Sequence, residues 1–275
     1  MKYTCTKDTI IIEDTKDFDI SHILECGQVF TYKKNAENDY DVYSCDQFAN
    51  VKLLDNKYVI TCTDVKYFVN YFDLDTDYGI IKKNLGKSKY IVDAINFGHG
   101  IRILKQNLLE VIIGFIISAN NNIKRIMTTM QKIREYGEKR EGYYAFPSLD
   151  VLQNITIDEF KDMGAGYRAE YLYDTIRRLK KVDFEKTYKQ DTSALKKWLL
   201  SLKGVGPKVA DCILLFGYGR CDCFPVDTWI EKVYVDLFHK KENSIKMSSD
   251  LIKYFGEYAG YAQQYLFFYR RSFVK

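Results

Sequence analysis

A lysine and an aspartate in the C-terminal third of the chain have the chemistry of a nucleophile and its electrostatic partner. Lys208 follows the turn Gly204-Val205-Gly206-Pro207, and Asp227 ends the motif Phe224-Pro225-Val226-Asp227. A lysine amine that is partly removed from water can attack an electrophilic carbon. A nearby carboxylate favours the positive charge that develops on a sugar ring when a glycosidic bond breaks. The pair therefore predicts amine chemistry at C1′ of a sugar. A solvated lysine and an aspartate that only caps a helix are the alternatives.

The turn before Lys208 is suited to holding a phosphate. Gly204 and Gly206 leave their backbone amides uncovered, and Pro207 fits the first turn of a following helix. Val205 can anchor the turn in the core. Because free amides at a helix N-terminus bind phosphate, we expect a hairpin between two helices that contacts the DNA backbone without reading sequence. An ordinary turn that needs glycine for geometry alone is the alternative.

These residues must be positioned by two kinds of structure. Up to about residue 62 the pattern is short and β-like, whereas from about residue 107 the apolar period is helical. The expected strands are 9–13, 29–33, 40–43, 51–54 and 58–62, with a turn at Asp55-Asn56 and a helix over 64–72. The order predicts an α+β fold, in which an N-terminal antiparallel sheet domain, residues 1–105, packs on a mostly helical domain, residues 106–275.

Polar residues mark where several of these helices begin. Asn107 with Glu110 predicts a capping box, and so does Thr156 with Glu159. Ser148 is expected to cap another helix. Residues 195–202 and 208–216 are the expected arms of the hairpin around Gly204.

Composition excludes several classes of protein. Hydrophobic residues make up 47% of the chain and aromatic residues 15%, which excludes a largely disordered protein. The net charge is only +4, so a DNA-binding surface must come from local basic clusters, for which 124–125, 177–181 and 270–271 are the candidates. Neither a signal peptide nor an apolar run of about 18 residues is present in the sequence, so we expect no membrane partner.

The cysteines and histidines argue against a disulfide framework or a metal centre. The seven cysteines are odd in number and scattered, which favours reduced thiols in a cytoplasmic protein. The three histidines are isolated in sequence, so no zinc set is expected.

Five blocks together resemble a known family. They are residues 26–30, 118–123, 164–169, 202–212 with 224–227, and 258–267. In this order they resemble the helix-hairpin-helix DNA glycosylases with a Gly/Pro-rich loop and an aspartate, and among them the bifunctional 8-oxoguanine DNA glycosylase/AP lyases. The resemblance covers nearly the whole chain.

The resemblance implies excision of 8-oxoguanine from duplex DNA, followed by strand cleavage through β-elimination. It implies that Lys208 attacks C1′ and forms a Schiff base while Asp227 stabilises the developing positive charge. The flipped base would be bound by the carbonyl of Gly27, the amide of Gln263, and stacking on Phe267 and Cys212. On the other side of the duplex, Asn120 would fill the vacated space, Tyr167 would wedge beside the orphaned base, and Arg125 and Arg168 would contact the opposite cytosine. An interhelical turn at Asn120 and simple packing of Tyr167 are the alternatives.

The same resemblance implies a partner and a setting. The partner is double-stranded DNA containing oxidised guanine, bound by a monomer in a bacterial or archaeal cytoplasm, at the nucleoid. The chemistry requires no cofactor, and no cysteine follows Cys223 to form the iron–sulfur cluster of related glycosylases. A glycosylase for another lesion and a non-catalytic DNA-binding module remain as rival functions.

The chain departs from the family pattern at four places. Thr31-Tyr32 follows the Gly27 block where Arg-Trp is common, and Pro207 precedes the lysine. Trp229 stands where some members have a phosphate-binding histidine, and Arg270 stands where some have an acidic residue. These departures concern opposite-base choice and phosphate contacts.

Overall fold

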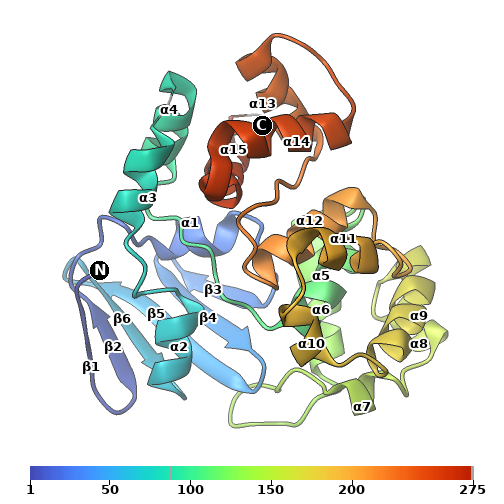
Figure 1. Ribbon diagram of the computed structural model, residues 1–275. Helices are drawn as coiled ribbons and strands as arrows, with labels where there is room; N and C mark the ends of the chain where they lie inside the picture. The colour runs from blue at the N-terminus through green and yellow to red at the C-terminus, as the bar shows by residue number, and fades with distance from the viewer. Residues whose placement is uncertain (87, 274–275) are drawn as a thin grey trace.

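The computed structural model describes residues 1–86 and 88–273 and has an α+β fold (Figure 1). A twisted antiparallel sheet from the first part of the chain lies beside a larger assembly of helices from the rest. The predicted fold class is confirmed.

The sheet has six strands in the order β1-β2-β6-β5-β4-β3. The strands are β1 (Tyr3–Cys5), β2 (Thr9–Ile12), β3 (Tyr32–Ala36), β4 (Asp39–Ser44), β5 (Gln47–Leu54) and β6 (Lys57–Cys62). Along β4 every second residue is buried, which is the alternation of a sheet with one face on the core. Asp55 and Asn56 join β5 to β6 with φ of 48° and 60°, the left-handed pair that a two-residue hairpin requires.

The strand predictions fail most clearly between residues 29 and 33. Val29 and Phe30 are buried in an irregular segment, and β3 begins only at Tyr32. Apolar residues in that segment serve packing against helices, so their presence did not indicate a strand. Strand β1 was not expected because it is only three residues long.

Short helices interrupt and follow the sheet. They are α1 (Ile20–Glu25), α2 (Val65–Tyr71), α3 (Tyr78–Leu85) and α4 (Lys89–Phe97). Of these, only α2 was predicted, although α3 and α4 are one and two residues longer than α2.

The remaining helices form the larger assembly. They are α5 (Leu108–Ser118), α6 (Ile123–Arg134), α7 (Leu149–Leu152), α8 (Ile157–Asp162), α9 (Ala169–Leu179), α10 (Phe184–Tyr188), α11 (Thr192–Leu199), α12 (Pro207–Phe216), α13 (Thr228–Phe238), α14 (Ser244–Phe255) and α15 (Ala259–Ser272). Ser148 caps α7, and Thr156 with Glu159 forms a complete capping box at α8, as predicted.

The expected capping box at α5 is only half correct. The Asn107 side chain does accept hydrogen bonds from the amides of residues 109 and 110. Glu110, however, is buried and accepts a hydrogen bond of 2.9 Å from Nη2 of Arg134. Its partner lies on α6 because α5 runs through the interior, where a carboxylate needs a paired cation.

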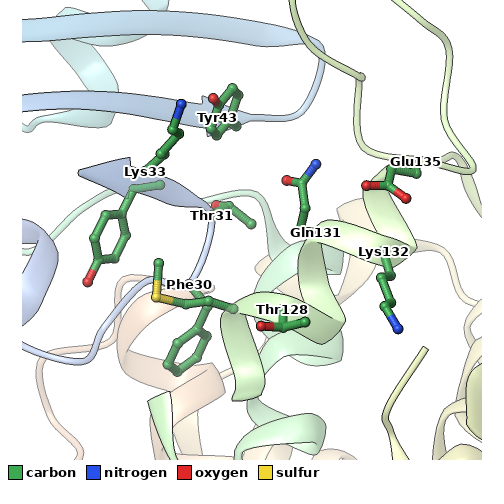
Figure 2. Close-up of a pocket in the computed structure, with 10 residues that line it drawn as sticks. Phe30, Thr31, Lys33, Tyr43, Thr128, Gln131, Lys132 and Glu135 are labelled. Atoms are coloured by element: carbon green, nitrogen blue, oxygen red, sulfur yellow. The ribbon is translucent and has the colours of Figure 1, made fainter. Parts of the chain in front are cut away.

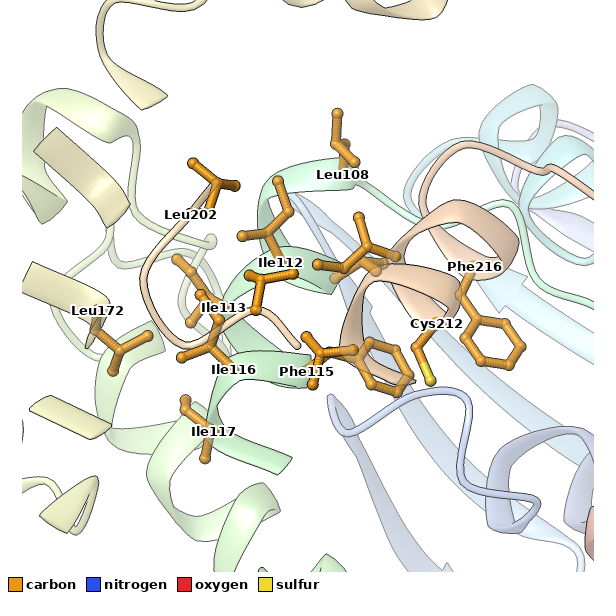
Figure 3. Close-up of a cluster of buried hydrophobic side chains, with 14 of the residues drawn as sticks. Leu108, Ile112, Ile113, Phe115, Ile116, Ile117, Leu172, Leu202, Cys212 and Phe216 are labelled. Atoms are coloured by element: carbon orange, nitrogen blue, oxygen red, sulfur yellow. The ribbon is translucent and has the colours of Figure 1, made fainter. Parts of the chain in front are cut away.

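Helix α5 is the centre of the largest hydrophobic cluster. Phe115 on α5 stacks on Phe216 of α12, with ring centroids 5.4 Å apart and an interplanar angle of 11°, and Cys212 lies beside them (Figure 3). This packing fixes α12, which carries Lys208, against the middle of the molecule.

A second cluster joins the two ends of the chain. Buried residues of α3 and α4 pack with those of α13, α14 and α15, so this cluster contains residues from both sides of the domain boundary expected at 105/106. A third cluster fills the space between the sheet and helices α1 and α2. Within residues 1–86 and 88–273, no helix is long and apolar enough to cross a lipid bilayer.

Candidate active site

One cavity of about 560 Å³ brings together residues from distant parts of the sequence. Its lining includes five residues expected at the site, Gly27, Asn120, Lys208, Asp227 and Phe267. They come from the loop after α1, the turn between α5 and α6, the start of α12, the start of α13, and α15. The cavity is therefore the place where the predicted nucleophile and carboxylate meet two of the four predicted base-binding residues, whereas Cys212 and Gln263 are buried and do not line it.

Lys208 is held at the edge of the core by the start of α12. Gly206 precedes the helix and Pro207 is its first residue, so Lys208 occupies the first turn. Its Nζ lies 5.4 Å from the ring centroid of Phe115, and the residue is half-buried. Burial raises the pKa of Cys212, one turn further on, to about 11. The thiol therefore stays protonated at neutral pH. The role of the Lys208 amine as the nucleophile stays a prediction.

Asp227 caps α13 and lines the cavity at the same time. Its Oδ1 accepts hydrogen bonds from the amides of Trp229 and Ile230, both at 3.0 Å. Both capping bonds use the same oxygen of the carboxylate. The two interpretations of Asp227, a helix cap and a negative charge facing Lys208 across a cavity, are thus compatible.

Glycine suits the two hairpin positions, 204 and 206, on different grounds: conformation and packing at Gly204, and open space at Gly206. Gly204 has φ of +83°, and a Cβ there would lie 2.8 Å from the Tyr171 side chain, so its role is packing and backbone conformation. Gly206 has φ of −89° at the N-cap of α12, and a Cβ there would meet nothing within 4 Å. Val205 is buried in the main cluster and anchors the turn. The exposed position 206 leaves room for a phosphate at the N-terminus of α12.

Gly27 lies directly against residues of α15. Its φ is +85°, and a Cβ added there would lie 3.0 Å from Nη1 of Arg271 and 3.2 Å from Cε1 of Phe267. Both features disfavour a larger residue.

The backbone on both sides of Gly27 is held by side chains. The carbonyls of residues 25, 26 and 28 accept hydrogen bonds from Arg271, Gln264 and Gln106, in that order. The loop is therefore rigidly placed, as a carbonyl that reads a base must be.

Three residues one turn apart on α15 face this region. Gln263, Phe267 and Arg271 follow i, i+4 spacing and so share a helix face. Gln263 is 5% exposed, and its Oε1 is buried without a hydrogen-bond partner among the described residues. An unpaired buried acceptor is costly, and a ligand with N–H donors would satisfy it. Arg271 was not among the predicted site residues, although its spacing from Phe267 would have indicated it.

The three asparagines between α5 and α6 have separate functions. Asn121 donates to the carbonyl of Ile117 at 3.1 Å, and Asn122 caps α6 through the amide of Arg125 at 2.9 Å. Asn120 is exposed and has φ of +49°, a conformation that asparagine tolerates better than most residues. Two of the asparagines thus build the turn, and the third is presented at the cavity.

The neighbouring residues Tyr167 and Arg168 support that turn. Arg168 is 4% exposed and donates to the carbonyls of Ala119 and Asn120, both at 2.7 Å. It also donates to the carbonyl of Ala165 at 3.3 Å. Tyr167 is 55% exposed, and the Arg168 guanidinium lies 4.3 Å from its ring centroid. The structure therefore presents Tyr167 to the outside and uses Arg168 internally.

Arg125 differs from Arg168 in being exposed. A Cβ on Gly166 would lie 3.7 Å from Nη2 of Arg125 and 4.0 Å from Nη1 of Arg168, so the two guanidinium groups approach the same glycine. Contact of either arginine with a cytosine stays a prediction, and Arg125 is the one whose guanidinium is accessible.

Comparison with known proteins agrees with this geometry. Residues 10–112 match the family model of the 8-oxoguanine DNA glycosylase N-terminal domain. A probable N-glycosylase/DNA lyase of Methanothermobacter thermautotrophicus is 32% identical over 228 residues, which cover 73% of this chain and 71% of the relative. The N-glycosylase/DNA lyase of Saccharomyces cerevisiae is 27% identical, with 90% of this chain and 82% of that protein covered.

A solved structure extends the similarity to the whole chain. The Clostridium acetobutylicum 8-oxoguanine glycosylase/lyase, in complex with double-stranded DNA containing cytosine opposite 8-oxoguanine, has a TM-score of 0.93 and 35% identity, covering 99% of this chain and 98% of that one. This chain belongs to the 8-oxoguanine DNA glycosylase/lyase family.

The departures from the family pattern can now be placed. Trp229 lines the cavity two residues after Asp227, and Lys232 lies 4.6 Å from its ring centroid. Arg270, one residue before the cavity-lining Arg271, pairs with Asp236 at 3.5 Å. In this member of the 8-oxoguanine DNA glycosylase/lyase family, the end of α15 therefore brings two cations to the region, one of which lines the site.

A second cavity of about 480 Å³ lies on the other side of Phe30. It is bounded by the sheet and α6, and Thr128 and Gln131 of α6 lie across it from Lys33 and Tyr43 (Figure 2). Phe30 lines both cavities and packs edge-on against Phe115 at 5.4 Å. Phe30 is thus shared by the linings of the two cavities.

Asp19, His22 and His99 also come together, with one ligand atom of each within 4.8 Å of the others. Sequence spacing did not indicate this group. Asp19 caps α1 through the amide of His22, and Nδ1 of His22 accepts a hydrogen bond from the amide of Gly100 at 3.3 Å. These contacts explain the cluster as the anchor of α1, the helix that leads to Gly27.

Proposed function

We propose that this protein excises 8-oxoguanine from duplex DNA and then cleaves the strand by β-elimination. The observation that carries the proposal is that Lys208 and Asp227 line one cavity with Gly27 and Phe267. An amine, a carboxylate and a base-binding wall around a single cavity are what a glycosylase with lyase activity needs. Family membership and the similar structure bound to lesion-containing DNA support the same substrate.

In the first step, the amine of Lys208 attacks C1′ of the flipped nucleotide. The bond between C1′ and the base nitrogen breaks, and the base leaves with the bonding electron pair. Asp227 lowers the energy of the oxocarbenium-like transition state because its carboxylate is fixed at the start of α13 before the reaction begins.

In the second step, the amine loses a proton and the sugar ring opens to give a Schiff base at C1′. A proton then leaves C2′, and the C3′–O bond breaks to release the 3′ phosphate. This chemistry uses groups of the protein and the sugar alone.

The turn at Asn120 is suited to the DNA side of the process. Flipping a base costs a few kcal/mol and leaves a gap in the stack. Asn120 is exposed beside the cavity, and Tyr167 is an exposed aromatic nearby that hydrogen-bonds to the carbonyl of Ala119 at 3.3 Å. We infer that the two fill the gap and support the orphaned base, with Arg125 in reach of the opposite cytosine.

The proposal is tested by borohydride trapping on duplex DNA with one 8-oxoguanine, placed opposite each of the four bases in turn. We expect a covalent protein–DNA adduct that disappears in Lys208→Gln. Lys253→Gln changes an exposed lysine of α14 and is the matched control, which should trap like the parent protein. No adduct with an intact lesion base, whatever base stands opposite, would contradict the bifunctional mechanism and favour the rival functions.

A further inference from the structure

The wall that is expected to bind the flipped base contains a cation that has no assigned role. Arg271 lines the active-site cavity together with Gly27, Phe267 and Lys208. Its Nη2 donates a hydrogen bond to the carbonyl of Glu25, the last residue of α1. The carbon of its guanidinium lies 5.1 Å from the ring centroid of Phe267. One side chain therefore joins the C-terminus of α1, the Gly27 loop and the aromatic platform.

The second nitrogen of the fork is the one closest to Gly27. A Cβ on Gly27 would lie 3.0 Å from Nη1 of Arg271, so this nitrogen occupies the space beside the loop that reads the base. Guanidinium nitrogens are donors only, and the group is always charged. The fork is held by its contact with Glu25, so its direction is fixed before DNA binds.

The negative charges of the cavity lie at the start of α13, not on the wall formed by the Gly27 loop and Phe267. Its charged side chains are Lys208, Asp227, Glu231 and Arg271. The two carboxylates belong to the N-cap and first turn of α13, and Lys208 belongs to the first turn of α12. Arg271 is the charge that contacts the Gly27 loop and Phe267. The base-binding wall is therefore locally positive, although the cavity as a whole is balanced.

We propose that Arg271 determines substrate class by selecting neutral purines with outward carbonyl oxygens and rejecting cationic, alkylated bases. This rests on the proposed function, because it assigns the Gly27 wall to the flipped base. A fixed guanidinium favours a carbonyl acceptor such as that of 8-oxoguanine through a charge-assisted hydrogen bond. It disfavours a base that already carries a positive charge, because like charges repel more strongly away from water. One rival function is a glycosylase for another lesion. If that lesion were a cationic alkylated base, this wall would bind it weakly.

The test measures binding in the Lys208→Gln background, where the lesion remains uncut. Competition experiments at one fixed salt concentration use three duplexes of the same sequence, with 8-oxoguanine, guanine or 7-methylguanine opposite cytosine. Arg271→Met removes the charge, Arg271→Lys keeps it without the fork, and Arg270→Met changes a neighbouring arginine on the same helix as the matched control.

We expect Arg271→Met to reduce the preference for 8-oxoguanine over 7-methylguanine by about tenfold or more, since one charge-assisted contact is lost and one repulsion removed. Affinity for the guanine duplex should change less than about threefold, because a guanine that stays in the stack does not reach the wall. Arg271→Lys should keep the discrimination against 7-methylguanine. Arg270→Met removes a charge from the same basic cluster and should keep the ratios among the three affinities.

Two results would overturn the proposal. One is an equal loss of affinity for all three duplexes in Arg271→Met, which would mark a general structural or backbone role. The other is an unchanged preference in Arg271→Met. If Arg271→Met does not fold, loss of the discrimination against 7-methylguanine in Arg271→Lys would refute it. Failure of the proposed function is a separate outcome, since it would be seen as missing borohydride adducts with Arg271 intact.

Discussion

Replacing Gly27 by alanine separates backbone strain from damage to the site, because the chain offers a matched glycine. Gly142 has φ of +81°, close to the +85° of Gly27, and a Cβ there would meet nothing within 4 Å. A non-glycine residue in this left-handed region costs about 1–2 kcal/mol. Gly142→Ala should therefore lower the free energy of unfolding by about that amount and leave excision unchanged.

Gly27→Ala should cost more and should also slow the reaction. Its Cβ would lie 3.0 Å from Nη1 of Arg271 and 3.2 Å from Phe267, so both must shift by a few tenths of an ångström. Arg271 cannot yield freely because it also bonds the carbonyl of Glu25. Overpacking of this kind adds about 1–3 kcal/mol to the strain. A displaced base-binding wall should slow excision by about 100-fold, since reactions depend steeply on positioning.

The two variants are compared by urea unfolding and by single-turnover excision of 8-oxoguanine. The reasoning requires that Gly27→Ala be both less stable and much slower than Gly142→Ala. Equal excision rates in the two variants would refute it, because the loop at Gly27 would then not form part of the base-binding wall.

Three further substitutions test two residues of the site, Asp227 and Asn120, and one buried carboxylate of α12, Asp211. Asp227→Asn should keep the helix cap and change the free energy of unfolding by less than about 0.5 kcal/mol. The rate of single-turnover excision should fall by about 100-fold or more because the charge is lost. An unchanged rate would limit the role of Asp227 to capping. Asn120→Gly removes the strain of φ +49° and should leave the free energy of unfolding within about 1 kcal/mol of that of the parent protein. The rate of excision should fall, because no side chain then fills the gap in the base stack. A normal rate would count against that role. Burial raises the pKa of Asp211 from 3.8 to about 6. The folded protein therefore binds the proton of this carboxyl more tightly than the unfolded chain does. As a result, the contribution of the carboxyl to stability decreases as the pH rises from about 3.8 to about 6. In urea unfolding, the stability of Asp211→Asn relative to the parent should increase across that interval by about 2–3 kcal/mol, whereas a pH-independent difference would show that the burial penalty is absent.

The helix starts that carry Lys208 and Asp227 could be predicted from sequence because their motifs are local. The glycines and proline before Lys208 start a helix whatever surrounds them, and Asp227 before an apolar run caps the next one. The capping box at Thr156 and Glu159 was predictable for the same reason. Patterns within about four residues need no knowledge of the fold.

What sequence could not supply depends on contacts between distant segments. Glu110 fits a capping box by spacing, but its position inside the molecule pairs it with Arg134. Arg271 stood in a basic pair, and only the fold shows that it contacts the loop at Gly27. The hydrogen bonds from Arg168 to three carbonyls of neighbouring turns were likewise not visible in the sequence, and its contact with the opposite base stays a prediction.

The place of α15 in the chain has a consequence for how the protein matures during translation. Synthesis proceeds from the N-terminus, and early parts of a chain can begin to fold before later ones emerge. Lys208 and Asp227 leave the ribosome before Gln263, Phe267 and Arg271, which complete the wall around Gly27. During synthesis, Lys208 is therefore present for a time without the residues proposed to select its substrate. The wall proposed to select the lesion is therefore complete only once α15 packs against α4 and the loop after α1.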